Sequence, residues 1–417
     1  MNEKIIAVID MKAFYASIEC VERGSDPFST PLAVTDITRK EATIVLSVSP
    51  YLKELGVPSR CRRKDLPSNI EGLIYAPPQM EKYVKISAEI VSIFLDFVGL
   101  DDIHIYSIDE SFLDLTPYLK LYKCSPYELA KKILNRVYEK TKLPATCGLG
   151  SNMFLAKVAD DIYAKKSKDF IGTLYSNEIK EKLYPITPLN KIWGISNGYL
   201  TRLNKLGIYK VEDLAKFDLE LLKKEFGILG EELHNHANGL DDTNIRDKYT
   251  PINKALSNGQ VLLKDYNYKN AKLILKEMND ELAFRLREIN RKTNCVHLYI
   301  GYSLCSNEVG FAKNMTLSKS TNNTKDLFDA LNYLYDSYIE DKPIRRIGLS
   351  YSNLVISHSD QLSLFKDLKE EEIESNMFNA FDEIQNKYGK DKLLRLTSKD
   401  KDSTIKERHN QIGGHRR

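Results

Sequence analysis

The sequence predicts an α+β protein of several domains. With 417 residues, the chain is too long for one ordinary hydrophobic core, and two to four domains are expected. Short apolar runs rich in β-branched residues alternate with helical periodicity through about the first 170 residues. Short helices broken by glycine follow, and a polar, turn-rich stretch separates them from a second region of helices and strands. These observations favour strands and helices arranged in more than one layered unit.

The first region is expected to form one layered domain with an insertion. Residues 4–11, KIIAVIDM, are typical of a buried strand, and residues 13–23, AFYASIECVER, have a helical rhythm. Between residues 26 and 78, proline and basic residues interrupt short apolar runs, which predicts a small inserted subdomain. A helix, a strand, a helix, a strand and a helix are expected next, over residues 83–98, 104–115, 125–143, 145–150 and 151–166.

Short helices broken by glycine are predicted from Pro188 onward. Two helices joined by a tight turn at WGIS, residues 193–196, would resemble a helix-hairpin-helix, whose turn amides can face a phosphate. A plain connection between bundle helices is the alternative. Residues 239–252 are the expected linker, and the charged residues 359–417 are expected to be a largely flexible tail. The region between them is expected to hold helices over 270–290 and 324–340, and strands over 295–303 and 344–355.

Composition narrows the partners and the location. The formal charge is +3, but residues 244–358 hold 17 Lys and Arg against 12 Asp and Glu, a mild hint of a phosphate-backbone partner. Six cysteines are scattered without a CxxC pair, which favours buried thiols over zinc ribbons or disulfides. No apolar run is long enough to cross a membrane, and the start lacks a signal-peptide pattern. A cytoplasmic location is therefore expected.

Acidic residues occupy strands that are otherwise apolar. Asp109, Glu110 and Asp114 lie within YSIDESFLDL, residues 106–115, and Asp10 ends the first strand. Buried carboxylates without partners cost several kcal/mol or become protonated. Because no Lys or Arg lies close to Asp109 in the sequence, a hard divalent metal such as Mg²⁺ is the expected compensating charge.

Three acids on two neighbouring strands would suit a two-metal site for phosphoryl transfer. The alternative is structural, because an acid at a strand end is commonly an exposed edge residue or a helix N-cap. Consecutive side chains of an ideal strand also point to opposite faces. Asp109 and Glu110 can therefore reach one metal pair only if the strand bends, ends or forms a hairpin there.

The motifs VIDMKAFYASIE and YSIDESFLDL resemble the two palm signatures of the Y-family translesion DNA polymerases. The resemblance is closer to the UmuC-like branch, of the ImpB/MucB/SamB type, than to the DinB-like branch. It continues in the family's order through IVLSVSPYLKELGV, GLGSNMFLAKVADD, IWGISNGYLTRLNKLGI, ALSNGQVLLKDY and HNQIGGH. It implies a right-hand polymerase with a palm over 1–25 and 79–170, fingers over 26–78, a helical thumb over 171–238, and a DNA-binding little finger over 253–358.

The resemblance also implies the metal ligands. Asp10, Asp109 and Glu110 match the acids that bind two Mg²⁺ ions in the family, and the Met11 carbonyl is a further expected ligand. One ion would activate the primer 3′-hydroxyl, and the other would hold the triphosphate. Asp114 is expected to support the site or to cap a turn.

The same resemblance implies a nucleotide site. Tyr15 matches the steric gate, the aromatic residue that leaves no room for a ribose 2′-hydroxyl. Phe14 is expected to pack beside it, with its amide facing the triphosphate, and Ser47 and Lys53 are further expected contacts. In the family, a second lysine also contacts the triphosphate. Lys165 corresponds to it only if the match is shifted by one residue, and Lys157 is a weaker candidate. The better-known branch has a tyrosine six residues before the glycine that is Gly56 here; this chain has Pro50 there and Tyr51 next to it.

QLSLF, residues 361–365, resembles the peptide by which bacterial polymerases engage the β sliding clamp. Gln361 would supply hydrogen bonds, and the apolar contacts are expected from Leu362, Leu364 and Phe365.

The function that the resemblance implies is template-directed, low-fidelity DNA synthesis across lesions in SOS mutagenesis. Its partners would be primer-template DNA, a dNTP, the clamp and SOS accessory proteins. Two alternatives are another palm-type nucleotidyltransferase, such as a cyclase, and a catalytically inactive protein that binds DNA and the clamp.

Overall fold

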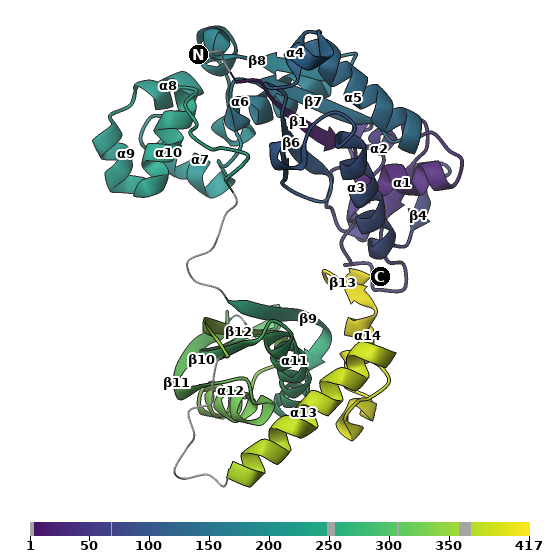
Figure 1. Cartoon of the computed structure of the whole chain (residues 1–417), viewed down its shortest axis with the longest axis vertical. Helices are drawn as coiled ribbons and strands as arrows, with labels where there is room; N and C mark the ends of the chain where they lie inside the picture. Colours follow the sequence, from purple (N-terminus) through teal and green to yellow (C-terminus); the bar gives the residue numbers. More distant parts are fainter. Residues whose placement is uncertain (1–3, 68, 248–254, 307, 358–367) are drawn as a thin grey trace. The chain divides into compact units, whose positions relative to one another are not determined.

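The computed structural model describes residues 4–67, 69–247, 255–306, 308–357 and 368–417. The chain divides into two compact units, residues 1–248 with 416–417 and residues 249–415 (Figure 1). None of the helices within the described ranges is both long and apolar enough to cross a membrane.

A five-stranded sheet forms the centre of the first unit, with the strand order β5-β6-β1-β7-β8. These strands are β5 (Ile103–Ile105), β6 (Glu110–Asp114), β1 (Ile6–Met11), β7 (Ala145–Gly150) and β8 (Ile171–Leu174). β1 pairs antiparallel with both of its neighbours, and the register sets Asp10 opposite Glu110. The apolar residues of β1 are buried, whereas Asp10 is partly exposed. The sheet therefore delivers two carboxylates to neighbouring positions at one edge of its core.

Helices α3 (Met80–Phe94), α4 (Leu119–Tyr122), α5 (Pro126–Thr141) and α6 (Met153–Val158) accompany this sheet (Figure 1). α5 begins behind a capping box, in which the Glu128 N–H donates to the Ser125 hydroxyl. α6 lies against β7, where the sheet presents Gly148 and Gly150. A Cβ atom at Gly148 would lie 2.1 Å from the carbonyl oxygen of Ala156. Only glycine allows the helix backbone to approach the strand this closely.

Residues 26–78, the predicted insertion, contain a separate three-stranded sheet of order β3-β2-β4. Its elements are β2 (Leu32–Val34), β3 (Ser47–Val48), α2 (Pro50–Glu54) and β4 (Ile74–Ala76). Its core is apolar and consists of Ala33, Val45, Val48, Leu52, Val57 and Leu66. α1 (Phe14–Glu22) contacts β2 and β3, so the helix that follows β1 also supports the insertion.

A helical region follows β8. It contains α7 (Asn197–Lys205), α8 (Val211–Lys216), α9 (Leu219–Phe226) and α10 (Ile228–Ala237), packed around a common apolar core. The expected pair of helices around residues 193–196 is wrong in detail. These residues join the 3-10 helix Leu189–Lys191 to α7, so only the second of the two expected helices is an α-helix. Trp193 packs against Phe112 of β6 and against Tyr106 in the turn before it. Residues 206–210 are the turn that joins two α-helices, α7 and α8.

The second unit is built on a four-stranded antiparallel sheet of order β11-β10-β12-β9. Its elements are β9 (Leu256–Tyr266), α11 (Tyr268–Glu288), β10 (Arg291–Tyr302), β11 (Phe311–Thr321), α12 (Thr324–Tyr338) and β12 (Ile344–Ile356). Apolar residues of α11 and α12 form one core with one face of the sheet. Within it, the Tyr351 hydroxyl donates to the Asn279 side-chain oxygen over 2.7 Å. None of the described helices packs against the other face of the sheet (Figure 1).

The expected flexible tail is wrong for residues 368–417. They form α13 (Leu368–Tyr388), α14 (Ile405–His409) and a short hairpin of β13 (Gln411–Ile412) and β14 (His415–Arg416). The charges that suggested disorder are paired instead with charged residues of α11, both basic and acidic. Arg287 of α11 donates to both carboxylate oxygens of Asp382 in α13. Arg395 pairs with Asp280 of α11. Residues 361–365, which resemble a clamp-binding peptide, lie outside the described residues, and their role stays a prediction.

Gly148→Ala is expected to destabilise the first unit. The added methyl group would overlap the α6 backbone, and overpacking of this kind costs about 1–3 kcal/mol. The free energy of unfolding and the hydrogen exchange of the α6 amides measure the effect. Gly198→Ala in α7 is the matched control, because the nearest atom to its new Cβ would be Ser196 Oγ at 3.8 Å. Equal stability of the two variants would contradict the role given to the α6 contact.

Candidate active site

The two adjacent acids lie where a hairpin turn leads into β6. The N–H groups of Tyr106 and Ser107 donate to the Glu110 carbonyl oxygen over 3.0 and 3.1 Å, so β5 turns into β6 here. Asp109 therefore lies in the turn, and Glu110 is the first residue of β6. The Met11 N–H donates to the Asp109 carbonyl oxygen over 2.9 Å, which holds the turn beside the end of β1. The alternation of side chains along an ideal strand does not apply to this pair.

A cleft of about 650 Å³ opens where the ends of these strands meet the insertion. The predicted residues that line it are Asp10, Met11, Phe14, Tyr15, Ser47, Lys53, Asp109 and Lys165. They come from the central sheet, α1, the insertion and the segment after α6. Glu110 is the predicted site residue that the cleft lining does not include, and only 10% of its side chain is exposed.

The insertion supplies one wall of the cleft. Ser47 lies in β3, and Lys53 lies in the last turn of α2. Pro50 also lines the cleft, whereas Tyr51 packs against the core of the insertion. The cleft lining thus includes no tyrosine in place of the one that the better-known branch carries at this position.

Lysines of one helical segment neutralise the acids, which the sequence did not lead us to expect. Lys157 Nζ lies 3.0 Å from Glu110 Oε1 and 3.2 Å from Asp161 Oδ1. Lys165 Nζ lies 2.7 Å from Asp10 Oδ2 and 2.6 Å from Asp161 Oδ1. The absence of basic residues near Asp109 in the sequence was therefore misleading. The regular spacing of Lys157, Asp161 and Lys165 was the signal that could have revealed the cluster.

A π-turn sets the position of Lys165. After α6 the helix continues as the π-turn Ala159–Tyr163 and the 3-10 turn Ala164–Lys166. In a regular α-helix, residues eight apart such as Lys157 and Lys165 would point roughly 80° apart. A π-turn takes up one additional residue, so Lys165 points more nearly in the direction of Lys157 than it would in a regular α-helix. The π-turn also gives a physical reason for the one-residue shift in the expected lysine position.

The acids form a set of oxygen donors that fits a hard divalent cation. Burial raises the pKa of Glu110 to about 7, although the charge of Lys157 lowers it. Burial also raises the pKa of Asp160, which is completely enclosed. Among the described residues, carboxylate oxygens of Asp10, Asp160 and Asp161 lie within 4.8 Å of one another, and Asp10 alone of the three predicted acid ligands belongs to this set. Oxygen ligands without sulfur or imidazole are those that Mg²⁺ prefers.

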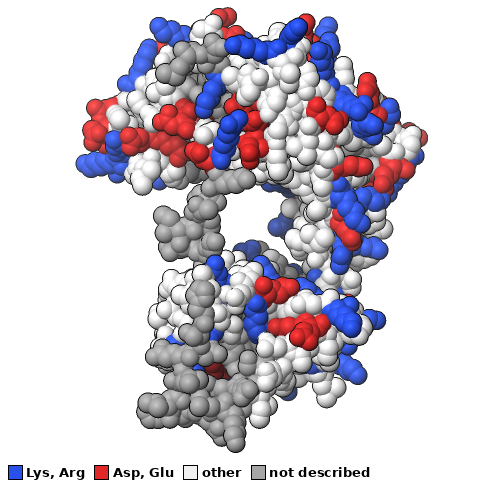
Figure 2. Space-filling view, in the orientation of Figure 1, with Lys and Arg blue, Asp and Glu red and all other residues white. Residues whose placement is uncertain are grey.

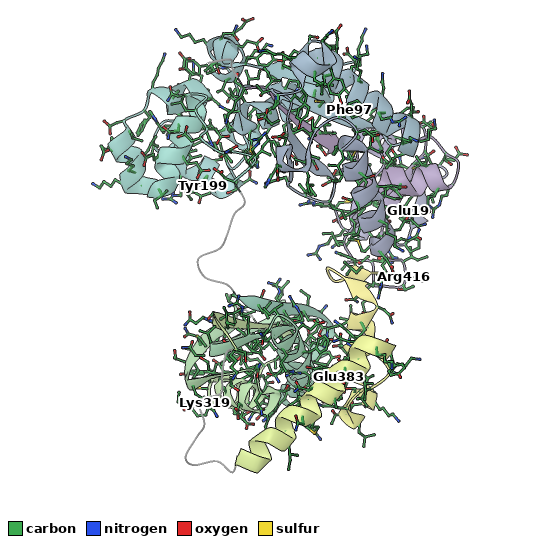
Figure 3. The ribbon with its side chains drawn as sticks, in the orientation of Figure 1. Glu19, Phe97, Tyr199, Lys319, Glu383 and Arg416 are labelled. Atoms are coloured by element: carbon green, nitrogen blue, oxygen red, sulfur yellow. The ribbon has the colours of Figure 1, made fainter. Side chains whose placement is uncertain are left out.

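Tyr15 is held rigidly in the cleft wall. Its ring stacks on that of Tyr83, with the centroids 4.5 Å apart and 18° between the planes. The Tyr83 hydroxyl donates to Glu19 over 2.7 Å, and Gln79 donates to the same carboxylate oxygen over 2.9 Å. Glu19, labelled in Figure 3, is buried and also pairs with Arg23. Burial and the charge of Asp109 raise the pKa of Tyr15, so its hydroxyl stays neutral at ordinary pH.

Other basic residues of the cleft were not predicted. Lys12 and Arg60 both line it, and Arg60 adopts a φ of 64°. Burial lowers the pKa of Lys12, and the neighbouring charge of Lys53 lowers it further.

Asp114 accepts the Thr116 N–H over 2.9 Å and caps the turn after β6.

Two family models match the chain, the impB/mucB/samB family over residues 9–161 and the impB/mucB/samB family C-terminal domain over residues 253–364. The "Putative UV-damage repair protein UvrX" of Bacillus subtilis (strain 168) is 34% identical over 99% of this chain and 98% of its own length. "DNA polymerase IV 2" of the same organism is 32% identical over 100% of this chain and 99% of its own length.

A solved Y-family DNA polymerase chimera has a similar fold. It is 24% identical, with a TM-score of 0.68, and the match covers 84% of this chain and 99% of the chimera. The predicted fold class, an α+β right-hand polymerase, is thereby confirmed. The chain belongs to the impB/mucB/samB family, and its fold is that of the Y-family DNA polymerases.

Proposed function

We propose that the protein is a template-directed DNA polymerase that copies damaged templates with low fidelity. The observation that carries this proposal is the single cleft in which Asp10 and Asp109 meet Tyr15, Lys53 and Lys165. Carboxylates for metal, an aromatic residue for the sugar and lysines for a triphosphate are the groups that nucleotidyl transfer needs. The names of the relatives, a polymerase IV and a UV-damage repair protein, support the same role.

Asp10, Asp109 and Glu110 would hold two Mg²⁺ ions, together with the Met11 carbonyl. Bound there, the ions would stabilise negative charge on the attacking and leaving oxygens. The hairpin at Asp109 and the β1–β6 pairing fix the backbone from which these side chains project. Such preorganisation reduces the reorganisation that the reaction requires.

The lysines of the cleft would bind the triphosphate. Lys53 comes from the insertion and Lys165 from the segment after α6, and both line the cleft. Burial lowers the pKa of Lys53, and the charge of Lys165 lowers it further, whereas the acids Asp10 and Asp109 raise it. A polyanion placed among these cations would stabilise their charged forms. Ser47 and the Phe14 amide would add neutral donors at the same end of the cleft.

Tyr15 would select the sugar. Its ring is fixed by the stack on Tyr83, which in turn is held by the buried Glu19. A ring that cannot move aside leaves no space for a 2′-hydroxyl. The insertion adds only strands of two or three residues, so it would enclose a nascent base pair loosely. Loose enclosure would permit damaged bases at the expense of fidelity.

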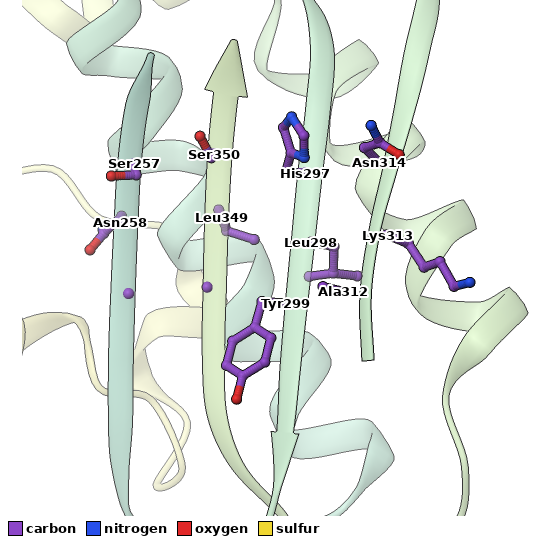
Figure 4. A pocket seen from close by; sticks show the side chains of 12 residues that line it. Ser257, Asn258, His297, Leu298, Tyr299, Ala312, Lys313, Asn314, Leu349 and Ser350 are labelled. Carbon is purple, nitrogen blue, oxygen red and sulfur yellow. The ribbon is translucent and has the colours of Figure 1, made fainter. Parts of the chain in front are cut away.

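The sheet face without helices in the second unit would contact DNA. It carries a groove of about 400 Å³ across all four strands (Figure 4). Register pairs set Asn314, His297, Ser350 and Ser257 side by side, and Figure 4 shows their side chains in one row. Gly348 and Gly259 follow in the next open row, where Tyr299 lies against Gly348. Small polar side chains allow a sugar-phosphate backbone to approach closely and donate to it.

Charge supports a DNA partner only in part. On the face drawn in Figure 2, acidic and basic side chains are interspersed over the first unit. Among its described residues, this face of the first unit therefore offers no extended basic patch to DNA, and contact there would depend on local groups. Binding of the β sliding clamp by residues 361–365 and cooperation with SOS accessory proteins belong to the same proposal, and they rest on the sequence alone.

Asp109→Asn/Glu110→Gln is expected to abolish DNA synthesis while DNA binding persists. The change removes two negative charges that would hold the metal, and a loss of several kcal/mol lowers the rate by about 10³-fold or more. Primer extension with Mg²⁺ and four dNTPs measures it, with Asp218→Asn as the control, because asparagine also caps α9. Extension by the double variant at the wild-type rate would refute the assigned metal site.

Tyr15→Ala is expected to admit ribonucleotides. The selectivity for dNTP over rNTP, measured as the ratio of kcat/KM values, should fall by about tenfold or more, which corresponds to about 1.4 kcal/mol. Tyr15→Phe keeps the stacked ring and should keep the selectivity. If both variants select the sugar as the wild type does, another residue performs this role.

Ser257→Glu/Asn314→Glu is expected to weaken DNA binding by about tenfold at low salt. The two new carboxylates would lie at the two ends of the groove row and repel phosphates, and salt would screen this repulsion. Fluorescence anisotropy with a labelled primer-template measures the Kd at several salt concentrations. Tyr333→Glu on α12, where the native side chain is 63% exposed, controls for added charge away from the sheet face. Equal weakening by the control would argue against contact through the groove.

A further inference from the structure

The ammonium group of Lys165 lies among three carboxylates. Its Nζ is 2.7 Å from Asp10 Oδ2, 2.6 Å from Asp161 Oδ1 and 3.4 Å from Asp160 Oδ2. These three acids also have carboxylate oxygens within 4.8 Å of one another, a spacing at which one cation can serve all three. The lysine thus occupies a cation position built into the protein.

The electrostatics of this position bind the lysine firmly. Burial alone would lower the pKa of Lys165, but the charges of Asp10, Asp160 and Asp161 outweigh it and raise the pKa. Asp160 is completely buried and cannot exchange its partner for water. Removal of the ammonium group would leave three acids facing one another in a partly dry site.

Asp10 has two roles that compete. It is a proposed metal ligand, and its Oδ2 already accepts from Lys165. A Mg²⁺ ion binds carboxylate oxygen at about 2.1 Å, so an ion on Asp10 and the ammonium group would be close, mutually repelling charges. Metal binding at Asp10 therefore favours movement of Lys165 away from that carboxylate.

Lys165 has somewhere to move. Its side chain lines the same cleft as Lys53 and is 37% exposed. Lysine carries its charge on a flexible four-carbon stem, and Asp161 can retain the ammonium group during a short displacement. A triphosphate in the cleft would attract it in the direction away from Asp10.

We propose that Lys165 is an internal counter-ion that occupies Asp10 in the absence of nucleotide and leaves it when a triphosphate binds, so that metal and nucleotide bind cooperatively. This inference rests on the proposed function, because it takes Asp10 as a metal ligand and the cleft as the nucleotide site. It adds that Lys165 opposes metal binding when the cleft holds no nucleotide. Metal binding and nucleotide binding would then favour each other through the Lys165 side chain.

Two other lysines provide the comparison. Lys157 pairs with Glu110 but does not line the cleft, and its side chain is only 9% exposed. Lys53 lines the cleft and feels the charge of Asp10, but within the described part of the chain it forms no ion pair with that acid. Lys165 both pairs with a proposed metal ligand and lines the cleft. Lys53→Met is therefore a control for the loss of a nearby positive charge.

The test measures the binding of Mn²⁺, which takes oxygen ligands as Mg²⁺ does, by electron paramagnetic resonance without DNA. Lys165→Met should bind Mn²⁺ about tenfold more tightly than the wild type, and a non-hydrolysable dNTP analogue should no longer enhance this binding. Lys165→Arg retains the positive charge and should bind Mn²⁺ as weakly as the wild type. Lys53→Met should weaken binding of the analogue and leave the Mn²⁺ affinity nearly unchanged.

An unchanged Mn²⁺ affinity of Lys165→Met, or an equal gain in Lys53→Met, would overturn the counter-ion role. Asp109→Asn/Glu110→Gln separates this failure from that of the metal site. If that double variant loses Mn²⁺ while Lys165→Met binds as the wild type does, the metal site stands and the counter-ion role fails. If the double variant binds Mn²⁺ normally, the proposed metal site itself is wrong.

Discussion

The cost of burying negative charge governs the architecture of the first unit. The antiparallel pairing of β1 with β6 brings Asp10 opposite Glu110 at the edge of an apolar core. Carboxylates in such a position require cations nearby. The protein supplies them from Lys157 and Lys165, which reach the acids because α6 lies directly on β7. The charge balance of the cleft thus depends on the position of α6, which in turn depends on the glycines of β7.

The sequence was informative where a local pattern determines the structure. The apolar, β-branched residues before Asp10 predicted a buried strand, and the apolar run after Glu110 predicted its partner, whereas residues 106–109 form a turn and not the start of that strand. The residues expected to bind metal and nucleotide line one cleft, apart from Glu110. The lysine partners of the acids were missed because they belong to a segment far along the chain. The π-turn that directs Lys165 has no sequence signature beyond the one-residue shift.

The C-terminal segment illustrates a different limit. Its charged residues were interpreted as solvated, since a charge pattern alone does not indicate whether each charge has a partner. In the second unit, α11 presents Asp280 and Glu281 toward this segment, where Arg395, Arg408 and His409 meet them. The pairs are partly enclosed, so removal of one member would leave a charge that water reaches poorly. Order in this segment is therefore a tertiary property, and helical propensity alone could not reveal it.

The two walls of the cleft belong to different hydrophobic cores. Ser47 and Lys53 depend on the small core of the insertion, whereas Asp10 and Asp109 depend on the central sheet. Substitutions among Val45, Val48 and Leu52 would shift the wall that carries Ser47 and Lys53 without altering the core beneath the acids. Tolerance for altered bases and the chemistry of bond formation can thus diverge independently during evolution. A lineage could broaden its range of templates by repacking a few aliphatic side chains, and the reaction itself would remain the same.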